Sequence, residues 1–284
     1  MLIVVRMIPI KRLLMPTDLN DGTSMAMSYA MAIALAGKAE MWLLHFDPVA
    51  SRTMHVAGLR PAVEEHEVVH ARHRQEMDRL VDEMERQGIS VHPLLADEYD
   101  QEDIVRFTDS LKVDLVVMGT PHQASFPGPG GSHAGLLMRN SETPLLIVPD
   151  IPEITLKPQA LLFASTFRNE QQKAIASVAA LASVFKARVD VVFLNLFSHL
   201  IMEDVAREKV LQSVRVYPEI RFTVNVLNTN DEQWGVNTLA ARLDSDLIAV
   251  SMEHRSLLGR LLDPPFAERM LSHLRLPLLV VHSD

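Results

Sequence analysis

Short apolar runs alternate with longer segments of helical spacing along the whole chain. Buried parallel strands have this appearance, and the segments between them are typical of helices that cross from one strand to the next. The pattern predicts strands at Ile10 to Met15, Met41 to Phe46, Ile89 to Leu95, Asp114 to Met118, Pro144 to Val148, Gln159 to Ala164, Arg188 to Leu194, Arg221 to Leu227, Asp246 to Val250 and Pro277 to Val281.

Apolar residues at helical spacing fill the intervals between these strands. The predicted helices are Thr23 to Gly37, Pro61 to Gln87, Glu102 to Leu111, Ser132 to Asn140, Asn169 to Lys186, Ile201 to Val214, Glu232 to Leu243 and Pro265 to Leu274. Gly37 and Gly88 lie where helices commonly end, because glycine adopts the left-handed conformation of a C-terminal cap at little cost.

The same order of elements occurs twice. The segment Asp114 to Gly119 (DLVVMG) matches Asp246 to Ser251 (DLIAVS), and each is followed 25 or 26 residues later by Pro-Leu-Leu. Three prolines between residues 149 and 158 indicate a short, stiff connector. We therefore expect an α/β protein of two tandem doubly wound domains, residues 1–150 and 151–284, each a five-stranded parallel sheet flanked by helices.

The edge of a sheet needs a cover, since its unpaired backbone groups can join another strand. The last predicted strands of the two halves, Leu145 to Val148 and Leu278 to Val281, present matching apolar edges. We expect them to pair, which makes the chain an intramolecular pseudo-dimer. Two chains can associate further into a homodimer, and the sequence does not specify protein partners.

Composition narrows the classes of protein and partner. The 284 residues include no cysteine, carry a formal net charge of -9 and contain no apolar stretch near the ~20 residues of a membrane helix. The lack of cysteine excludes disulfides and thiolate zinc sites and favours a cytoplasmic protein. The lack of a long apolar stretch argues against a membrane partner. The acidic balance disfavours nucleic acid, because phosphate binding requires clustered Lys and Arg.

Ligands of doubly wound sheets bind beyond the carboxyl ends of the strands, where the strand order reverses. In the first half, the loop after the first strand is Pro16-Thr17-Asp18, and the loop after the fourth opens at Gly119 and contains Gly131 and Ser132. Glycines let backbone N–H groups approach phosphates, and a helix N-terminus at Ser132 favours anions. Asp18 can accept from a ribose hydroxyl or hold magnesium through water. These loops predict a nucleotide site.

Both loops resemble those of the universal stress protein family, whose members carry Pro-Thr-Asp after the first strand and Gly-x2-Gly-x9-Gly-Ser/Thr after the fourth. The resemblance implies small α/β domains, often present as tandem pairs or dimers joined through the fifth strand, and binding of ATP in one subgroup. On the family pattern, Pro16, Asp18 and Met41 border the adenosine, Gly119, with Met118 before it, lies at the ribose and first phosphate, and Gly131, Ser132 and His133 meet the remaining phosphates.

The first half departs from the family pattern in its glycine-rich loop. His122 stands at the position of the second glycine, and the interval from Gly119 to Gly131 is one residue shorter than in the family. The His122 side chain can occlude the phosphate loop, or a protonated imidazole there can contact phosphate.

The second half departs further. Ala164-Ser165-Thr166 replaces Pro-Thr-Asp, Ser251 replaces the first glycine, and Pro264-Pro265 replaces Gly-Ser. Proline has no N–H to donate and its ring blocks close approach, so we expect no ATP in this half.

The segment His66-Glu67-Val68-Val69-His70 matches His-Glu-x-x-His, in which two histidines hold zinc and the glutamate is a general base. His73 extends the same stripe. The segment lies in a charged crossover helix that has no counterpart in the second half, which favours a solvated helix face over a zinc hydrolase site. We therefore expect no metal and no catalytic residue.

The leading hypothesis is a stress-associated regulatory or binding protein with ATP in the first domain only. Two alternatives remain open. One is an interaction scaffold without nucleotide, and the other is a weak ATPase or a zinc-dependent hydrolase that uses the His66-Glu67-x-x-His70 helix.

Overall fold

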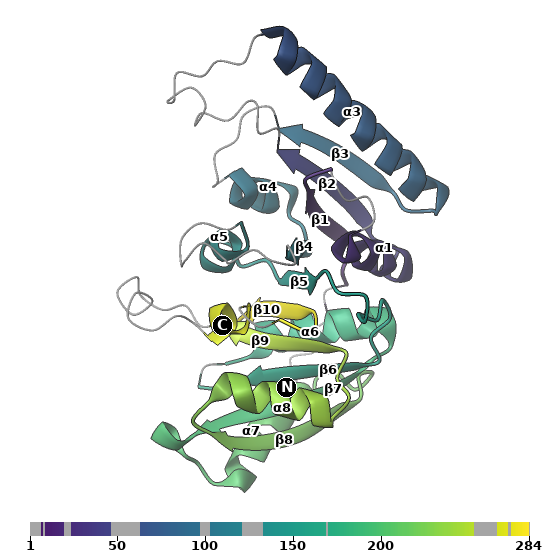
Figure 1. Cartoon of the computed structure of the whole chain (residues 1–284). Helices are drawn as coiled ribbons and strands as arrows, with labels where there is room; N and C mark the ends of the chain where they lie inside the picture. Colours follow the sequence, from purple (N-terminus) through teal and green to yellow (C-terminus); the bar gives the residue numbers. More distant parts are fainter. Residues whose placement is uncertain are drawn as a thin grey trace.

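The structure, a computed structural model, describes residues 7, 9–19, 24–46, 63–96, 103–120, 133–168, 170–252, 266–271 and 274–283, with the side chains of 63–67 and 133 excepted. Its strands form a twisted sheet that runs through the whole elongated molecule, with helices on both faces (Figure 1).

The first half of the described chain contains the following elements in order: β1 (Arg12–Thr17), α1 (Met25–Gly37), β2 (Glu40–Phe46), α3 (Val63–Arg86), β3 (Val91–Ala96), α4 (Asp103–Leu111), β4 (Leu115–Thr120), α5 (His133–Asn140) and β5 (Leu145–Pro149). The second half contains β6 (Ala160–Ser165), α6 (Gln172–Phe185), β7 (Arg188–Leu196), the short 3-10 helix η3 (Phe197–His199), α7 (Glu203–Val214), β8 (Phe222–Thr229), α8 (Glu232–Arg242), β9 (Leu247–Met252), α10 (Phe266–Leu271) and β10 (Leu278–His282).

These elements confirm the predicted α/β class and the predicted order, with two differences of detail. The sequence pattern did not predict η3, because three residues are too few to establish a period. The helix α1 does not end on a glycine cap: Gly37 is still helical, and Lys38 takes the left-handed conformation with φ 50°. At the end of α3, Gly88 does adopt a positive φ, of 88°.

The sheet is continuous across the two halves. Its strand order is β3-β2-β1-β4-β5-β10-β9-β6-β7-β8, so each half has the same internal order. Strands within each half are parallel, whereas β5 and β10 pair antiparallel. The expected pairing of the fifth strands is thereby confirmed, and the two five-stranded sheets are halves of one. The domain limits at residues 150 and 151 stay a prediction.

One carboxylate in each half holds the start of the central strand pair. Oδ2 of Asp114 accepts hydrogen bonds from the backbone N–H groups of Lys11 and Arg12, at 2.8 and 2.9 Å. Asp246 does the same for Gln159 and Ala160, at 2.7 and 3.0 Å. Hydrogen bonds to a charged acceptor are the stronger kind, so this aspartate fixes the register at the amino ends of β1 and β6. The internal match between the segments beginning at Asp114 and Asp246 has this physical cause.

Alternating strand residues divide the apolar core into two layers. Leu146 and Val148 of β5 face the layer that contains α1, α3, α6 and α7, and Leu145 and Ile147 face the layer that contains α4, α5, α8 and α10. Both layers run through both halves. The five residues of β5 are all buried, as expected of a strand covered on both faces.

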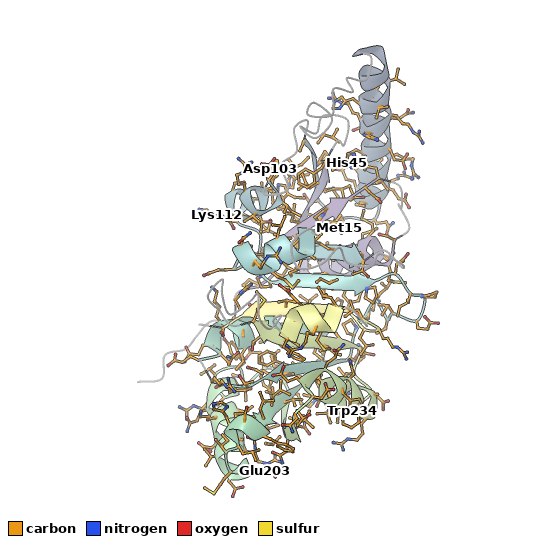
Figure 2. All side chains as sticks on the ribbon, turned by 60° about the vertical axis from the view of Figure 1, so that its left-hand side comes forward. Met15, His45, Asp103, Lys112, Glu203 and Trp234 are labelled. Carbon is orange, nitrogen blue, oxygen red and sulfur yellow. The ribbon has the colours of Figure 1, made fainter. Side chains whose placement is uncertain are left out.

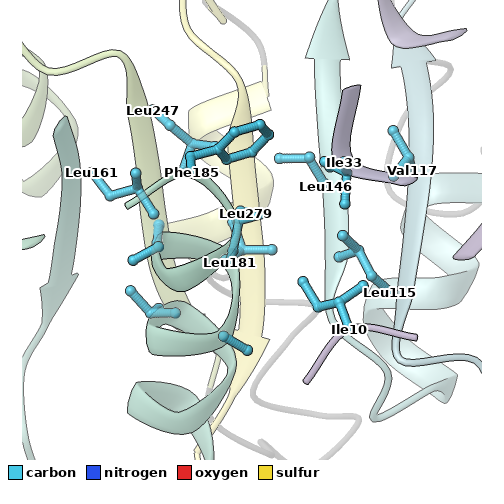
Figure 3. Packing of buried hydrophobic residues seen from close by; sticks show 14 of the residues in the cluster. Ile10, Ile33, Leu115, Val117, Leu146, Leu161, Leu181, Phe185, Leu247 and Leu279 are labelled. Carbon is cyan, nitrogen blue, oxygen red and sulfur yellow. The ribbon is translucent and has the colours of Figure 1, made fainter. Parts of the chain in front are cut away.

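Three kinds of contact join the halves. In the strand pair, Leu279 is opposite Leu146, and both are at most 1% exposed. On one face α1 packs on α6, where the rings of Tyr29 and Phe185 meet edge to face at 6.2 Å between centroids. Figure 3 shows the Phe185 ring of α6 beside Ile33 of α1. On the other face, Arg139 of α5 forms an ion pair with Glu268 of α10 at 3.5 Å.

Within the described residues, no helix combines the length and apolar character that a membrane span requires.

Replacing Leu279 with alanine tests how far the halves stabilise each other. The change leaves a cavity against Leu146, and we expect the free energy of unfolding to fall by about 2–5 kcal/mol in urea titrations followed by circular dichroism. The control Leu211→Ala removes a side chain that is 49% exposed, and its effect should stay within about 0.5 kcal/mol. Equal effects of the two variants would show that the strand pair contributes no tight packing.

Tyr29 offers a second test. Its side chain is fully buried, and its hydroxyl has no hydrogen-bond partner among the described residues. Burial, and then the nearby Asp246 carboxylate, raises the pKa of Tyr29 well above its ordinary value. Tyr29→Phe removes a desolvated hydroxyl and should leave the free energy of unfolding unchanged or raise it by about 1 kcal/mol, whereas Tyr29→Ala should lower it by about 3–5 kcal/mol. A clear loss in Tyr29→Phe would reveal a hidden partner of the hydroxyl.

Candidate functional site

The central strands of the first half separate at their carboxyl ends. β1 pairs with β2 along its full length, from Arg12 to Thr17, but with β4 only through Leu13 and Leu14. In the second half the equivalent pair of β6 with β9 extends through Ala164. The strand order reverses between β1 and β4, so the separation opens the sheet at the point where doubly wound folds bind ligands.

Pro16 explains the separation. The carbonyl of Arg12 accepts from the N–H of Asp114, so Arg12 directs its backbone groups toward β4. Alternate residues of a parallel strand share that direction, and Pro16, four residues later, falls in the same series. Proline has no N–H, so the next bond to β4 cannot form. Ala164 at the matching place in β6 has its N–H, and it pairs with Val250.

The turn after Pro16 is folded by its own side chains. The hydroxyl of Thr17 accepts a hydrogen bond from the N–H of Leu19 at 3.1 Å, and Leu19 has a positive φ of 63°. Leu19 is buried, whereas Asp18 is exposed at the tip of the turn. The buried Leu19 anchors the turn, so the Asp18 carboxylate is presented to solvent beside the opened strands.

The end of β4 lies close to the start of α1. A Cβ atom added to Gly119 would lie 3.3 Å from the Cβ of Ala26, a tighter contact than is usual. Glycine therefore lets the backbone of β4 approach α1, and Gly119 keeps an exposed main chain at the strand end. Met118, the residue before it, is 9% exposed and packs in the core layer of α4 and α5.

The structure separates Met41 from these residues. Met41 is the second residue of β2 and pairs with Leu13 near the amino end of β1. It is fully buried in the core, so it cannot border a ligand at the carboxyl edge, and its inclusion in the site was wrong. At the carboxyl end of β2 lie His45 and Phe46, and Phe46 packs edge to face on Phe107 of α4, with 6.1 Å between ring centroids.

The side chain of His45 contacts the turn formed by Pro16, Thr17 and Asp18. No sequence motif predicted this contact. The His45 side chain is 3% exposed and lies between the sheet and α3 (Figure 2). Nδ1 of His45 lies 2.9 Å from the carbonyl oxygen of Thr17, and Nε2 lies 3.3 Å from Nδ1 of His73. A carbonyl only accepts, so Nδ1 of a neutral His45 carries the proton and Nε2 accepts from His73. The pair ties the turn to α3.

The structure does not describe the side chains of the remaining predicted site residues. His122, Gly131 and Ser132 lie outside the described residues, and the backbone of His133 begins α5 without a described side chain. Of the predicted set, the structure brings Pro16, Asp18, Met118 and Gly119 to the carboxyl edge.

The corresponding edge of the second half is closed. The hydroxyl of Ser251 donates to that of Ser165 at 2.8 Å, bridging β9 and β6 where Gly119 and Thr17 stand in the first half. A cavity of about 60 Å³ remains there, lined partly by Phe266 and Glu232. Pockets for nucleotide-sized ligands occupy ~300–1,000 Å³, so this cavity is too small for one.

The His66-to-His70 segment lies in α3, as predicted. Nε2 of His70 is 3.2 Å from a guanidinium nitrogen of Arg74, and His73 contacts His45 on the sheet. These ring nitrogens therefore have protein partners. In the part of the chain that is described, no three His, Cys, Asp or Glu side chains form a group that could hold a metal ion.

Comparison with known proteins gives a family for the first half. Residues 9–149 match the universal stress protein family. A universal stress protein of Methanocaldococcus jannaschii is 25% identical over 152 residues, which are 49% of this chain and 94% of that protein.

Solved structures resemble the whole chain in fold. A universal stress protein from Archaeoglobus fulgidus DSM 4304 superimposes with a TM-score of 0.69 and 13% identity over 97% of both chains. A protein of unknown function from Pseudomonas aeruginosa PAO1 gives a TM-score of 0.68 and 18% identity over 97% of this chain and 93% of its own. At these identities the likeness concerns the fold.

Replacing His45 with leucine tests its support of the turn. The change leaves the buried Thr17 carbonyl without its donor, and we expect the free energy of unfolding to fall by about 1–3 kcal/mol, measured by urea denaturation. His73→Leu keeps the bond to Thr17 and should cost less. A greater loss in His73→Leu would place the main contribution on α3 instead of the turn.

Proposed function

The chain belongs to the universal stress protein family through residues 9–149, and on that premise we propose that its first half binds an adenine nucleotide while its second half does not. The observation that carries the proposal is the separation of β1 from β4 beyond Leu14, next to the exposed Asp18 and the main chain of Gly119. The matching strands of the second half stay paired as far as Ala164 and are bridged by two serines.

Each described residue at the opening has a chemical use toward a nucleotide. The main chain at Gly119 allows a ribose or phosphate to approach the strand end without meeting a side chain. The Asp18 carboxylate can accept a ribose hydroxyl or hold the waters of a magnesium ion. The sequence of the loop that follows, with Gly131 and Ser132 before a helix, supplies backbone N–H groups of the kind that bind phosphates.

Space supports the assignment of the nucleotide to one half only. In the second half the small cavity has a volume of about 60 Å³ and is lined by Arg168 as well as by Glu232, which is paired with Arg269. Its charges therefore do not exclude an anion, but its volume is too small for a polyphosphate. The second half then acts as a structural partner that completes the sheet.

A scaffold without nucleotide is the second candidate, and the β5 to β10 pairing favours it, because the chain already contains the pair of domains that dimers of this fold present. A scaffold needs the joined sheet alone. A binding protein needs the opening at Asp18 as well.

Titration of magnesium ATP into the purified protein, followed by calorimetry, separates the two candidates. We expect saturable binding at one site per chain, weakened at least about tenfold in Asp18→Ala, since a hydrogen bond to a charged group contributes about 1.5–3 kcal/mol. Asp78→Ala, which removes an exposed carboxylate on α3, is the matched control and should bind like the parent.

Three outcomes decide against the proposal. Absence of heat at millimolar ATP leaves the scaffold. Two sites per chain would contradict the closed second half. Equal binding by the parent and Asp18→Ala places the nucleotide elsewhere.

A further inference from the structure

A groove of about 700 Å³ lies at the junction of the halves, away from both carboxyl edges described above. It is bounded by the amino ends of β4 and β5, by α6 and by Leu279 of β10. It shares no lining residue with the small cavity of the second half. The groove therefore represents a separate space that the nucleotide proposal does not use.

The groove exists on one side of the junction because the two halves carry different residues at one helix position. α1 and α6 both end at a left-handed lysine, Lys38 and Lys186. Nine residues before these lysines stand Tyr29 and Ser177. The Tyr29 ring is fully buried against the second half, whereas Ser177 lines the groove. A serine in place of a phenol leaves the space unfilled.

The walls of the groove are apolar. Leu181 and Leu279 lie on one side, and Ile10 and Leu115 lie on the other, as Figure 3 shows. Ala180, which precedes Leu181 in α6, also lines the groove, and its small side chain fills little of the space between the two walls. A ligand with an apolar group can bury it here, and the volume falls within the range of ~300–1,000 Å³ that is usual for small-molecule sites.

The charged groups of the groove are mostly acidic. Glu142 and Lys173 form an ion pair with each other. Asp114 uses only Oδ2 for its two backbone bonds, so its second oxygen remains an acceptor. Asp109 lines the groove as well and makes no side-chain hydrogen bond or ion pair with the described residues. Two carboxylates therefore offer acceptors to a ligand, and the described lining contains no cation besides Lys173, which is paired with Glu142.

We propose that this groove binds a small amphipathic cation, an alkyl- or arylammonium whose apolar part lies against Leu181 and Leu279 and whose charge lies near Asp109 and Asp114. The carboxylates favour a cation and repel an anion, because like charges brought into a partly desolvated groove repel strongly. The apolar walls bind the hydrocarbon part through the area that is removed from water.

Phenethylamine, phenethyl alcohol and phenylacetate form a set of probes of similar size that share a phenyl group and carry an ammonium, a hydroxyl and a carboxylate. Ligand-observed nuclear magnetic resonance on the full chain should show phenethylamine binding in the low millimolar range, roughly what about nine heavy atoms allow. The alcohol should bind about fivefold to tenfold more weakly, and phenylacetate should not bind, since a charge-assisted hydrogen bond is lost and then replaced by repulsion.

Two variants locate the binding. Ser177→Tyr places in α6 the ring that α1 carries at the matching position, and it should abolish phenethylamine binding. Ser198→Tyr adds the same side chain at an exposed position in η3 and should leave binding unchanged. Asp109→Asn should weaken the amine several-fold and leave the alcohol unaffected.

Preference for the alcohol or for phenylacetate would overturn the assigned charge. Binding that survives in Ser177→Tyr, provided that variant keeps the circular dichroism spectrum of the parent, would overturn the location. Absence of phenethylamine binding at ~20 mM, well above the expected range, would overturn the site itself. None of these results bears on magnesium ATP, which is titrated independently.

Discussion

The antiparallel pairing of β5 with β10 is the contact on which the rest of the molecule depends. A parallel half-sheet of this topology ends in an apolar strand, and β10 covers the edge of β5 at Leu145, Leu146 and Ile147. The pairing sets α1 against α6 on one face and α5 against α10 on the other, so both core layers become continuous. The outer strands of the sheet, β3 and β8, have no covering strand among the described residues. In β3, Pro93 lacks an N–H that could pair with another strand, and on β8 the carbonyl of Val224 accepts a hydrogen bond from Arg207 of α7.

Single residues decide where this shared frame leaves space. Pro16 interrupts the bonds between β1 and β4, whereas Ala164 continues the corresponding bonds of β6. Gly119 leaves a strand end bare, whereas Ser251 closes its counterpart with a hydrogen bond to Ser165. The backbone is nearly the same in both halves. A proline without an N–H and a glycine without a side chain therefore account for the open strand ends of the first half.

The elements were predictable because each is encoded locally. Continuous apolar runs such as 145–148 indicate strands buried on both faces, and apolar residues at helical spacing indicate the helices between them. The strand pairing at the junction followed from the need to cover an edge. The bond from His45 to Thr17 was not predictable, since it depends on which strand ends meet. Met41 was misplaced because a family pattern gives order along the chain and not the end of the strand at which a residue lies. The junction groove depends on how α1 and α6 oppose each other, which no local pattern contains.

The open carboxyl edge and the junction groove lie at opposite ends of β4, which raises the question of whether occupancy of one affects the other. Coupling between sites requires an element with two alternative arrangements whose balance each ligand shifts. β4 is poorly suited to that role. Its amino end adjoins the bonds of Asp114 to Lys11 and Arg12, its carboxyl end packs against Ala26, and β5 pairs with it along its length. A strand held at both ends and along one side transmits no discrete shift.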